Sequence, residues 1–370
     1  MQRIRVLLIF GGDSSEHEIS CLTARGVLAA LDQNRFNVTC VGIARGGRWV
    51  MVAPDQVLDY RIGPDGSLPQ VDPAFDDAVL LRTADGLELG RRSGDRIVDP
   101  VTIDVAFALL HGPFGEDGTI QGLFELMGVR YVGAGVLASS VCQDKMAMKR
   151  QLQSHQIPVG PFVGFDQHTW RTNRAAVWSQ IDTLTYPLFV KPNRGGSSIG
   201  ISRITGPGEL EAAVATAQQH DPTVIVEQAL MGVREIECAV LGSLDQGPPR
   251  VSLPGEVVLH QENAFYDFEK KYLGDQPVSL SVPAELDPYL CEQIQQVALA
   301  SYLALGVEGL ARVDTFVLPS GEVIVNELNT MPGFTPTSMY PMLWQVCGLD
   351  YTALVTELID LALARPVGLR

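Results

Sequence analysis

Short apolar runs alternate with glycine-rich turns and amphipathic stretches along this chain. The first run, at residues 3–10, ends in Gly11-Gly12 and is followed by apolar side chains at helical spacing. Ser15 and Glu18 have the spacing of a capping box, which predicts the start of that helix. A buried strand, a glycine turn and a helix are therefore expected at the start of the chain, as in α/β proteins.

Two more apolar runs predict strands at 36–43 and 102–110. The residues between them, 45–100, are rich in Gly, Asp, Pro and Arg, and we interpret them as an elaborated surface region with no assigned chemistry. The loop HGPFGEDG, at 111–118, follows the second of these strands and precedes an apolar helix at 120–127.

Ligands of α/β units collect where strands end and helices begin. Glu16, in the first such turn, and the loop at 111–118 are therefore candidate binding residues. Each also has a plainer interpretation. An acid at a helix start stabilises the helix dipole, and a glycine-rich loop with Asp117 can be an ordinary capped turn.

The middle of the chain combines a lysine-bearing helix with a loop rich in glycine and serine. A capping box at Ser140 predicts a helix that extends to residue 153 and carries Lys145. A strand at 186–190 then leads into KPNRGGSSIG, at 191–200. Glycines and small hydroxyl residues let backbone N–H groups surround a phosphate, while the lysine supplies charge. This segment is a phosphate loop or, as the alternative, a flexible hairpin.

The last third of the chain contains two strands, a long polar loop and two helical stretches. The strands, at 223–227 and 234–241, are joined by a short linker that can act as a hinge between two lobes. The stretch QENAFYDFEKKYLGD, at 261–275, fits no period and is predicted to be a long loop of the kind that often forms a lid. An amphipathic helix is expected at 287–305, and a largely helical segment at 338–363.

Residues 311–333 have the pattern of a β-hairpin, with its turn at the sequence PSG. In that register Asp314 faces Glu327 and Arg312 faces Asn329, and all four side chains project from one face. Opposed carboxylates repel each other, whereas a hard cation would bind their oxygens. The alternative is a surface hairpin with a solvated row of charges.

Composition narrows the classes of function. With 46% hydrophobic and 19% charged residues, the 370-residue chain is typical of a globular protein of two or three domains. Its net charge of −16 argues against nucleic acid as a partner, but not against a nucleotide. No apolar stretch has the length of a membrane span or a signal peptide, so a cytoplasmic location without membrane contact is expected. The six scattered cysteines predict free thiols.

Together these motifs resemble the ATP-grasp enzymes and, in detail, the D-alanine–D-alanine ligase family. The resemblance rests on GGDSSEHEIS (11–20), LHGPFGEDGTIQG (110–122), DKMAMK (144–149), KPNRGGSSIG (191–200), FYDFEKKY (265–272), ARVD (311–314) and NELNTMPGFTPTSMYP (326–341). These segments are spread in the family's order over most of the chain. Residues 45–100 carry no motif of this family.

The resemblance implies a fold and a domain organisation. We expect an α/β protein, α+β in its ATP-binding part, with a Rossmann-like N-terminal substrate domain at 1–138. A two-lobed ATP-grasp fold would follow, with a central ATP-binding lobe at 139–226. A C-terminal lobe with the metal and acceptor sites would cover 227–370. The family is usually dimeric, so a homodimer is also expected.

The resemblance also implies a reaction, the ATP-dependent ligation of two D-alanine molecules for peptidoglycan synthesis. The carboxylate of the first D-alanine takes the γ-phosphoryl group of ATP and forms D-alanyl phosphate. The amine of the second D-alanine then displaces phosphate and gives D-alanyl-D-alanine. ATP is the expected cofactor, together with Mg²⁺ or Mn²⁺, commonly as two ions.

Each role in this reaction is carried over to the matching residue of this sequence. The implied metal ligands are Asp314, Glu327 and Asn329. The implied ATP-binding residues are Lys145, Lys191, Ser197, Ser198, Glu227, Gln228, Ala229, Leu230, Glu235 and Lys271. The implied catalytic residues are Glu16, Ser197, Arg312, Gly333, Tyr272 and Lys271, and the implied D-alanine contacts are Glu16, His111, Ser338 and Met339.

The resemblance also bears on the acceptor. The related D-alanine–D-lactate ligases lack a lid that ends in E-K-x-Y, so Lys271-Tyr272 favours an amine nucleophile. A D-alanine–D-lactate or D-alanine–D-serine ligase is the alternative. A different ATP-grasp ligase would lack Ser338 and the Glu16 motif, and a regulatory module without turnover would lack Arg312 or a metal ligand.

Overall fold

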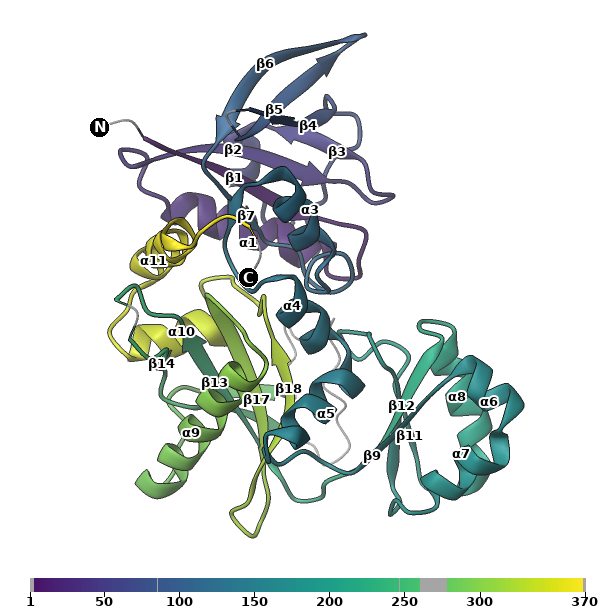
Figure 1. Ribbon diagram of the computed structural model, residues 1–370. Helices are drawn as coiled ribbons and strands as arrows, with labels where there is room; N and C mark the ends of the chain where they lie inside the picture. The colour runs from purple at the N-terminus through teal and green to yellow at the C-terminus, as the bar shows by residue number, and fades with distance from the viewer. Residues whose placement is uncertain (1–2, 85, 246, 260–277, 369–370) are drawn as a thin grey trace.

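The computed structural model describes residues 3–84, 86–245, 247–259 and 278–368. Within them the chain forms four β-sheets with helices packed around them (Figure 1). A five-stranded and a three-stranded sheet come from the N-terminal part, a four-stranded sheet from the middle, and a six-stranded sheet from the last third. The expected mixture of α and β elements is confirmed.

The first sheet has the strand order β3-β2-β1-β7-β8, and its neighbouring strands are parallel except for β2 and β3. Its strands are β1 (Ile4–Gly11), β2 (Phe36–Ile43), β3 (Trp49–Val52), β7 (Val105–Ala108) and β8 (Arg130–Tyr131). Helix α1 (His17–Ala30) connects β1 to β2. Apolar side chains are buried on both faces, which explains why these strands read as continuous apolar runs.

The strand predicted at 102–110 is wrong as a single element, because the chain changes sheets at Asp104. The second, three-stranded antiparallel sheet consists of β4 (Ala78–Thr83), β5 (Gly86–Ser93) and β6 (Arg96–Ile103). Asp104 accepts hydrogen bonds from the backbone N–H of Arg5 (2.8 Å) and from its Nε (3.0 Å). Residues 45–100 therefore contain ordered elements: β3, α2 (Pro54–Leu58), β4, β5 and part of β6.

The four-stranded sheet is antiparallel, in the order β11-β10-β12-β9. Its strands are β9 (Phe162–Asp166), β10 (Leu188–Pro192), β11 (Ser202–Ile204) and β12 (Thr223–Gln228). Three helices cover one of its faces: α6 (Gln167–Thr172), α7 (Arg174–Ile181) and α8 (Leu210–Gln218). In Figure 1 this unit is the teal lobe to the right of the molecule, with its own hydrophobic core.

The six-stranded sheet carries the hairpin that the sequence predicts. Its strands are β13 (Arg234–Leu241), β14 (Arg250–Val251), β15 (Gly255–Leu259), β16 (Val278–Ser281), β17 (Leu310–Val317) and β18 (Val323–Asn329). Helix α9 (Pro288–Ala304) packs on it, and the Asp287 side chain caps this helix by accepting from the Leu290 N–H at 3.0 Å. The helix predicted at 287–305 is confirmed.

The predicted pairs of the hairpin are confirmed, but the predicted register near the turn is wrong. Asp314 faces Glu327, and Arg312 faces Asn329. Closer to the turn Val317 faces Val323, and the register shifts by one residue next to Asp314. A β-bulge adds one residue to one strand, which is what restores the expected pairs at the far end. The turn geometry alone could not reveal this bulge.

Two predicted capping boxes are also wrong. Helix α1 begins at His17 with Glu16 as its N-cap residue and has no side-chain cap, and Glu18 pairs with Arg45 (2.7 Å). The predicted helix at 141–153 is divided into α4 (Val136–Gln143) and α5 (Lys145–Ser154). Asp144 separates them because its side chain accepts from the Ala147 N–H at 2.9 Å and caps α5.

The last helices join the C-terminal part of the chain to its beginning. Helix α10 (Met339–Val346) packs near β13, and α11 (Tyr351–Ala364) packs beside α1 against the first sheet, as the yellow and purple ribbons show (Figure 1). The hydrophobic core of that sheet therefore includes residues from both ends of the chain. The division of the chain at 138 and 226 stays a prediction.

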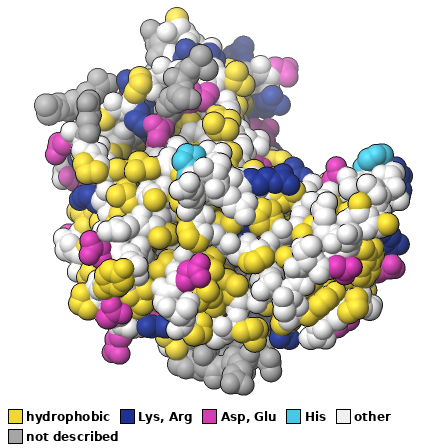
Figure 2. Space-filling view, turned by 60° about the horizontal axis from the view of Figure 1, so that its bottom comes forward, with side chains coloured by type: hydrophobic (Ala, Val, Ile, Leu, Met, Phe, Trp, Pro, Cys, Tyr) yellow, Lys and Arg dark blue, Asp and Glu magenta, His cyan; other side chains and the backbone are white. Residues whose placement is uncertain are grey.

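Acidic and basic side chains are interspersed on the face shown in Figure 2.

Within the described ranges, no helix combines the length and the apolar character that crossing a membrane requires.

Candidate functional site

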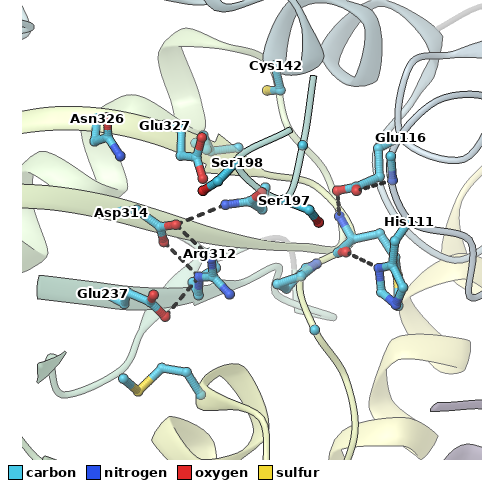
Figure 3. A pocket seen from close by; sticks show the side chains of 18 of the residues that line it. His111, Glu116, Cys142, Ser197, Ser198, Glu237, Arg312, Asp314, Asn326 and Glu327 are labelled. Carbon is cyan, nitrogen blue, oxygen red and sulfur yellow. Dashed lines mark hydrogen bonds and ion pairs between the residues drawn. The ribbon is translucent and has the colours of Figure 1, made fainter. Parts of the chain in front are cut away.

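A cavity of about 470 Å³ lies where segments of the first, the four-stranded and the six-stranded sheets meet. The predicted site residues that line it are Glu16, His111, Lys145, Lys191, Ser197, Ser198, Glu235, Arg312, Asp314, Glu327, Asn329, Gly333, Ser338 and Met339. Figure 3 shows several of these side chains from close by. The fold thus brings together most of the residues that the sequence singled out.

Two sets of predicted residues are not part of this lining. Glu227, Gln228, Ala229 and Leu230 lie at the end of β12 and just after it, outside the cavity lining. Lys271 and Tyr272 lie outside the described residues, as does the whole lid predicted at 261–275.

The hairpin presents an arginine, with only 11% of its side chain exposed, between carboxylates (Figure 3). Arg312 donates from Nε to Asp314 Oδ1 and from Nη2 to Asp314 Oδ2, both at 2.7 Å. Its Nε also lies 2.9 Å from Glu237 Oε2, and Asn329 Nδ2 donates to Asp314 Oδ2 at 3.0 Å. Charges removed from water need partners of opposite sign, and the ion pairs of Arg312 with Asp314 and Glu237 meet this need.

The chemistry of the predicted metal ligands fits Mg²⁺ or Mn²⁺. Asp314, Glu327 and Asn329 carry the oxygen donors that these ions prefer. Burial and the negative charges of Glu237 and Glu327 raise the pKa of Asp314 to about 7, although Arg312 opposes this. A divalent cation would relieve that repulsion. In the described part of the chain, no group of three or more histidine, cysteine or acidic side chains has the arrangement of a metal centre.

Positive charge enters the site from α5 and β10. Lys145 Nζ donates to the Gly195 carbonyl at 2.6 Å, and burial lowers the pKa of Lys145. Lys191 Nζ lies 2.5 Å from Glu227 Oε2, while Lys149 Nζ lies 2.9 Å from Glu227 Oε1. Burial alone would raise the pKa of Glu227, but the charges of Lys149 and Lys191 lower it strongly. Glu227 therefore stays ionised between two lysines.

The glycine and serine loop after β10 reaches over to the first sheet. Ser197 Oγ donates to Glu16 Oε1 at 2.8 Å. Both Ser197 (φ 52°) and Ser198 (φ 59°) have left-handed backbone, an uncommon conformation for residues other than glycine. Such strain persists where the surrounding structure holds it and is concentrated at functional sites.

The loop after β7 forms the other wall of the cavity. His111 Nδ1 lies 3.0 Å from the Met331 carbonyl, and burial lowers the pKa of His111. Glu116 accepts from the backbone N–H groups of Gly112 (2.8 Å) and Met331 (3.1 Å). Burial, together with the charge of Glu16, raises the pKa of Glu116 to about 8. Hydrogen bonds to Met331 therefore connect this wall to the segment that leads to Gly333.

The start of α10 supplies a place for an anion. Ser338 is the residue before the helix, and its Oγ lies 2.7 Å from Thr335 Oγ1 and accepts from the Thr335 N–H at 3.1 Å. The N–H groups of the first helical turn, from Met339 onward, have no partners within the helix. Such a terminus favours a carboxylate or a phosphate.

Three charged residues of the site were missed from the sequence: Glu116, Lys149 and Glu237. Glu116 and Lys149 stand inside the quoted segments LHGPFGEDGTIQG and DKMAMK, so their position was available but their role was not. Glu237 stands two residues after Glu235 on β13, and strand alternation could have placed it on the same face.

Comparisons with known proteins cover nearly the whole chain. The family model described as D-ala D-ala ligase N-terminus matches residues 5–134, and the model described as D-ala D-ala ligase C-terminus matches residues 151–360. A D-alanine–D-alanine ligase of Kineococcus radiotolerans is 50% identical, with 99% of this chain and 98% of that protein covered. A D-alanine–D-alanine ligase of Mycolicibacterium smegmatis is 46% identical, with 100% and 98% covered.

Solved structures agree with these matches. The VanG D-Ala:D-Ser ligase of Enterococcus faecalis has a TM-score of 0.81 at 35% identity, with 98% of this chain and 100% of that chain covered. A D-alanine–D-alanine ligase of Coxiella burnetii also has a TM-score of 0.81, at 31% identity, with 98% and 94% covered. The expected ATP-grasp architecture is thereby confirmed. This chain belongs to the D-alanine–D-alanine ligase family of ATP-dependent ligases.

Proposed function

We propose that this protein joins two molecules of D-alanine by a peptide bond, with ATP converted to ADP and phosphate, for peptidoglycan synthesis. The observation that carries the proposal is the hydrogen bond between Ser197, in the glycine and serine loop, and Glu16, in the first α/β turn. It joins a loop suited to phosphate with an acid suited to an ammonium group, in the same cavity as Arg312.

ATP would bind with its phosphates against Lys145, Lys191 and the loop at Ser197-Ser198. Glu227 to Leu230 would contact the adenine, and Glu235 the ribose. Asp314, Glu327 and Asn329 would hold one or two Mg²⁺ or Mn²⁺ ions, which, when bound, neutralise charge that develops on the transferred phosphoryl group. The two serines would also exclude water that could otherwise hydrolyse an acyl phosphate.

The two amino acids would lie on either side of Arg312. Glu16 would pair with the ammonium group of the first D-alanine, with His111 nearby, so that its carboxylate points at the γ-phosphate. Ser338 and the Met339 N–H would bind the carboxylate of the second D-alanine.

Amine attack on the acyl phosphate places negative charge on the carbonyl oxygen. Arg312 and the Gly333 N–H would stabilise that oxyanion.

Other parts of the proposal concern residues and properties beyond the cavity. Lys271 would reach the transferred phosphoryl group, and Tyr272 would hydrogen-bond with Ser197 and Glu16 as the lid closes. We further propose that the protein is a homodimer in the cytoplasm, because the family is usually dimeric. The full-length relatives at 46–50% identity are named D-alanine–D-alanine ligases, whereas the D-Ala:D-Ser ligase is 35% identical, so D-lactate and D-serine are not favoured as acceptors.

A phosphate-release assay tests this function. The purified protein with ATP and Mg²⁺ should release phosphate only when D-alanine is added, and mass spectrometry should detect D-alanyl-D-alanine. Reactions with added D-lactate or D-serine measure the choice of acceptor. Phosphate release that is independent of D-alanine, or a mixed product in excess of the D-alanine dipeptide at neutral pH, would contradict the proposal.

A further inference from the structure

Glu237 lines the cavity beside Arg312, yet the reaction above assigns it no task. Strands β13 and β17 are antiparallel neighbours, and Glu237 stands directly opposite Asp314 in their register. Their side chains therefore project from the same face of the sheet, toward Arg312. Glu237 is only 7% exposed, so its charge is held inside the protein (Figure 3).

Arg312 donates hydrogen bonds to Asp314 but none to its second acidic neighbour, Glu237. The single hydrogen on Nε is donated to Asp314 Oδ1 at 2.7 Å, and Nη2 donates to Asp314 Oδ2. Glu237 Oε2 lies 2.9 Å from the same Nε but receives no hydrogen bond from any described residue. The carboxylate of Glu237 is thus in contact with the guanidinium without receiving a hydrogen bond from it.

Binding of a cation by Asp314 would compete with its hydrogen bonds to the guanidinium of Arg312. An Asp314 oxygen that binds a divalent ion would turn a lone pair toward it, which weakens the hydrogen bond that the same oxygen accepts from the arginine. Arg312 would then be a largely buried cation whose bidentate pair with Asp314 is weakened, next to a positive ion that repels it. An acceptor for the Nε hydrogen is needed at that moment, and Glu237 already lies within hydrogen-bond distance.

We propose that Glu237 is a positioning residue that accepts the Nε–H of Arg312 when Asp314 turns to a bound cation. It would keep the Nη groups of Arg312 directed into the cavity, where the oxyanion forms. This inference rests on the proposed function, because it uses the metal-binding role of Asp314 and the oxyanion role of Arg312. Two other roles give different experimental results: Glu237 could itself be a cation ligand, or it could serve folding alone.

The variant Glu237→Gln removes the charge and keeps the shape. Glu256→Gln is a matched control, because Glu256 pairs with Arg234 on the same sheet (2.6 and 2.7 Å) outside the cavity lining. The full-length wild type and both variants are compared in D-alanine-dependent phosphate release. Electron paramagnetic resonance measures Mn²⁺ binding in the presence of a non-hydrolysable ATP analogue, which is a readout without turnover.

We expect Glu237→Gln to lower kcat by about 10-fold, because the glutamine oxygen can still accept the Nε–H but lacks the charge that strengthens this hydrogen bond. The KM for ATP and the Mn²⁺ affinity should stay within about threefold, and Glu256→Gln should keep wild-type kinetics. The double variant with Arg312→Met should be no slower than Arg312→Met alone, because both changes act through the same side chain.

Each other outcome overturns the inference. An unchanged kcat means that Arg312 does not need Glu237, and a large loss of Mn²⁺ affinity means that Glu237 is a cation ligand. If the two changes multiply, Glu237 acts independently of Arg312. Should Glu237→Gln fail to fold, Glu237→Asp keeps the charge at a greater distance and must still lower kcat without weakening Mn²⁺ binding. A wild type without D-alanine-dependent phosphate release would instead refute the proposed function, before any variant is compared.

Discussion

Several charged side chains in and beside the cavity lie next to partners of opposite sign. Arg312 lies between Asp314 and Glu237, and Glu227 lies between Lys149 and Lys191. Removing one member of such a pair is expected to cost more than the pair contributes, because the remaining charge stays buried without compensation. Substitutions here therefore need variants that separate chemistry from stability.

Arg312→Met should lower kcat by several orders of magnitude while ATP binding survives, because in the proposed mechanism the arginine acts on the oxyanion and not on the nucleotide. Turnover in the phosphate-release assay and ATP affinity from calorimetry measure the two effects. Arg312→Lys keeps a charge beside Asp314 and serves as the stability control. Loss of ATP binding in the methionine variant, with the fold intact by circular dichroism, would show that Arg312 has another role.

The raised pKa of Glu116 predicts that the free energy of unfolding depends on pH. Burial and the charge of Glu16 raise its pKa from 4.5 to about 8, so the folded protein keeps a proton that the unfolded chain has released. The stabilisation from this group is complete below about pH 4.5 and is lost as the pH rises through about 8, with a slope of about 1.4 kcal/mol per pH unit between these values. Urea unfolding from pH 5 to 8 measures it. Glu116→Gln should lack this component, and equal slopes in both proteins would contradict the assignment.

At the scale of single elements, the turn after β1 is tightly constrained. Gly11 has a φ of +87°, and a Cβ there would lie 2.4 Å from the Ile43 carbonyl oxygen. That oxygen also accepts the Gly12 N–H at 2.8 Å, which fixes the path of the chain toward Glu16. Strand packing and the position of the candidate ammonium-binding acid are thus set by the same turn.

Gly11→Ala should reduce the free energy of unfolding by about 2–4 kcal/mol, because backbone strain and the clash with the Ile43 carbonyl add together. The control Gly47→Ala has a similar φ of +83°, but nothing lies within 4 Å of its Cβ. It should cost only about 1 kcal/mol, from backbone strain alone. Chemical denaturation measures both values. Equal losses in the two variants would mean that the contact with Ile43 does not matter.

At the scale of the whole molecule, the cavity is formed by segments that are distant in the sequence, from Glu16 to Met339. Helix α11 packs the end of the chain against the first sheet, and Arg365 donates to the Gly133 carbonyl at 2.8 Å. On the other side, the Ser197–Glu16 hydrogen bond joins the loop of the four-stranded sheet to the turn after β1. Binding of the first D-alanine should therefore depend on a contact between separate units of the fold.

Ser197→Ala should raise the KM for the first D-alanine by about tenfold, the equivalent of one hydrogen bond to a charged group. The KM for ATP should change little, because the backbone of the loop is retained. Ser154→Ala, which removes a hydroxyl bonded to the Gln151 carbonyl on the surface of α5, is the control. Steady-state kinetics with varied D-alanine decides the question, and an unchanged KM would show that the link is not used in substrate binding.

The sequence alone determined much of this protein. The strands at 36–43 and 234–241 and the helix after Asp287 follow from apolar period and capping, which are local properties. The pairs Asp314–Glu327 and Arg312–Asn329 follow from strand alternation and an approximate turn. The spaced motifs were sufficient to identify the family, because they preserve chemistry in a set order.

Tertiary structure decided the rest, because alternation along a strand does not reveal which strand lies beside it. The change of sheet at Asp104 depends on Arg5, far away in the sequence, and the bulge of the hairpin depends on how β17 and β18 pair. The partners of Glu116 and Glu237 come from other elements, so no local pattern could predict them. The sequence therefore determined which chemical groups the site contains. Long-range packing decided which of them are buried, paired and charged.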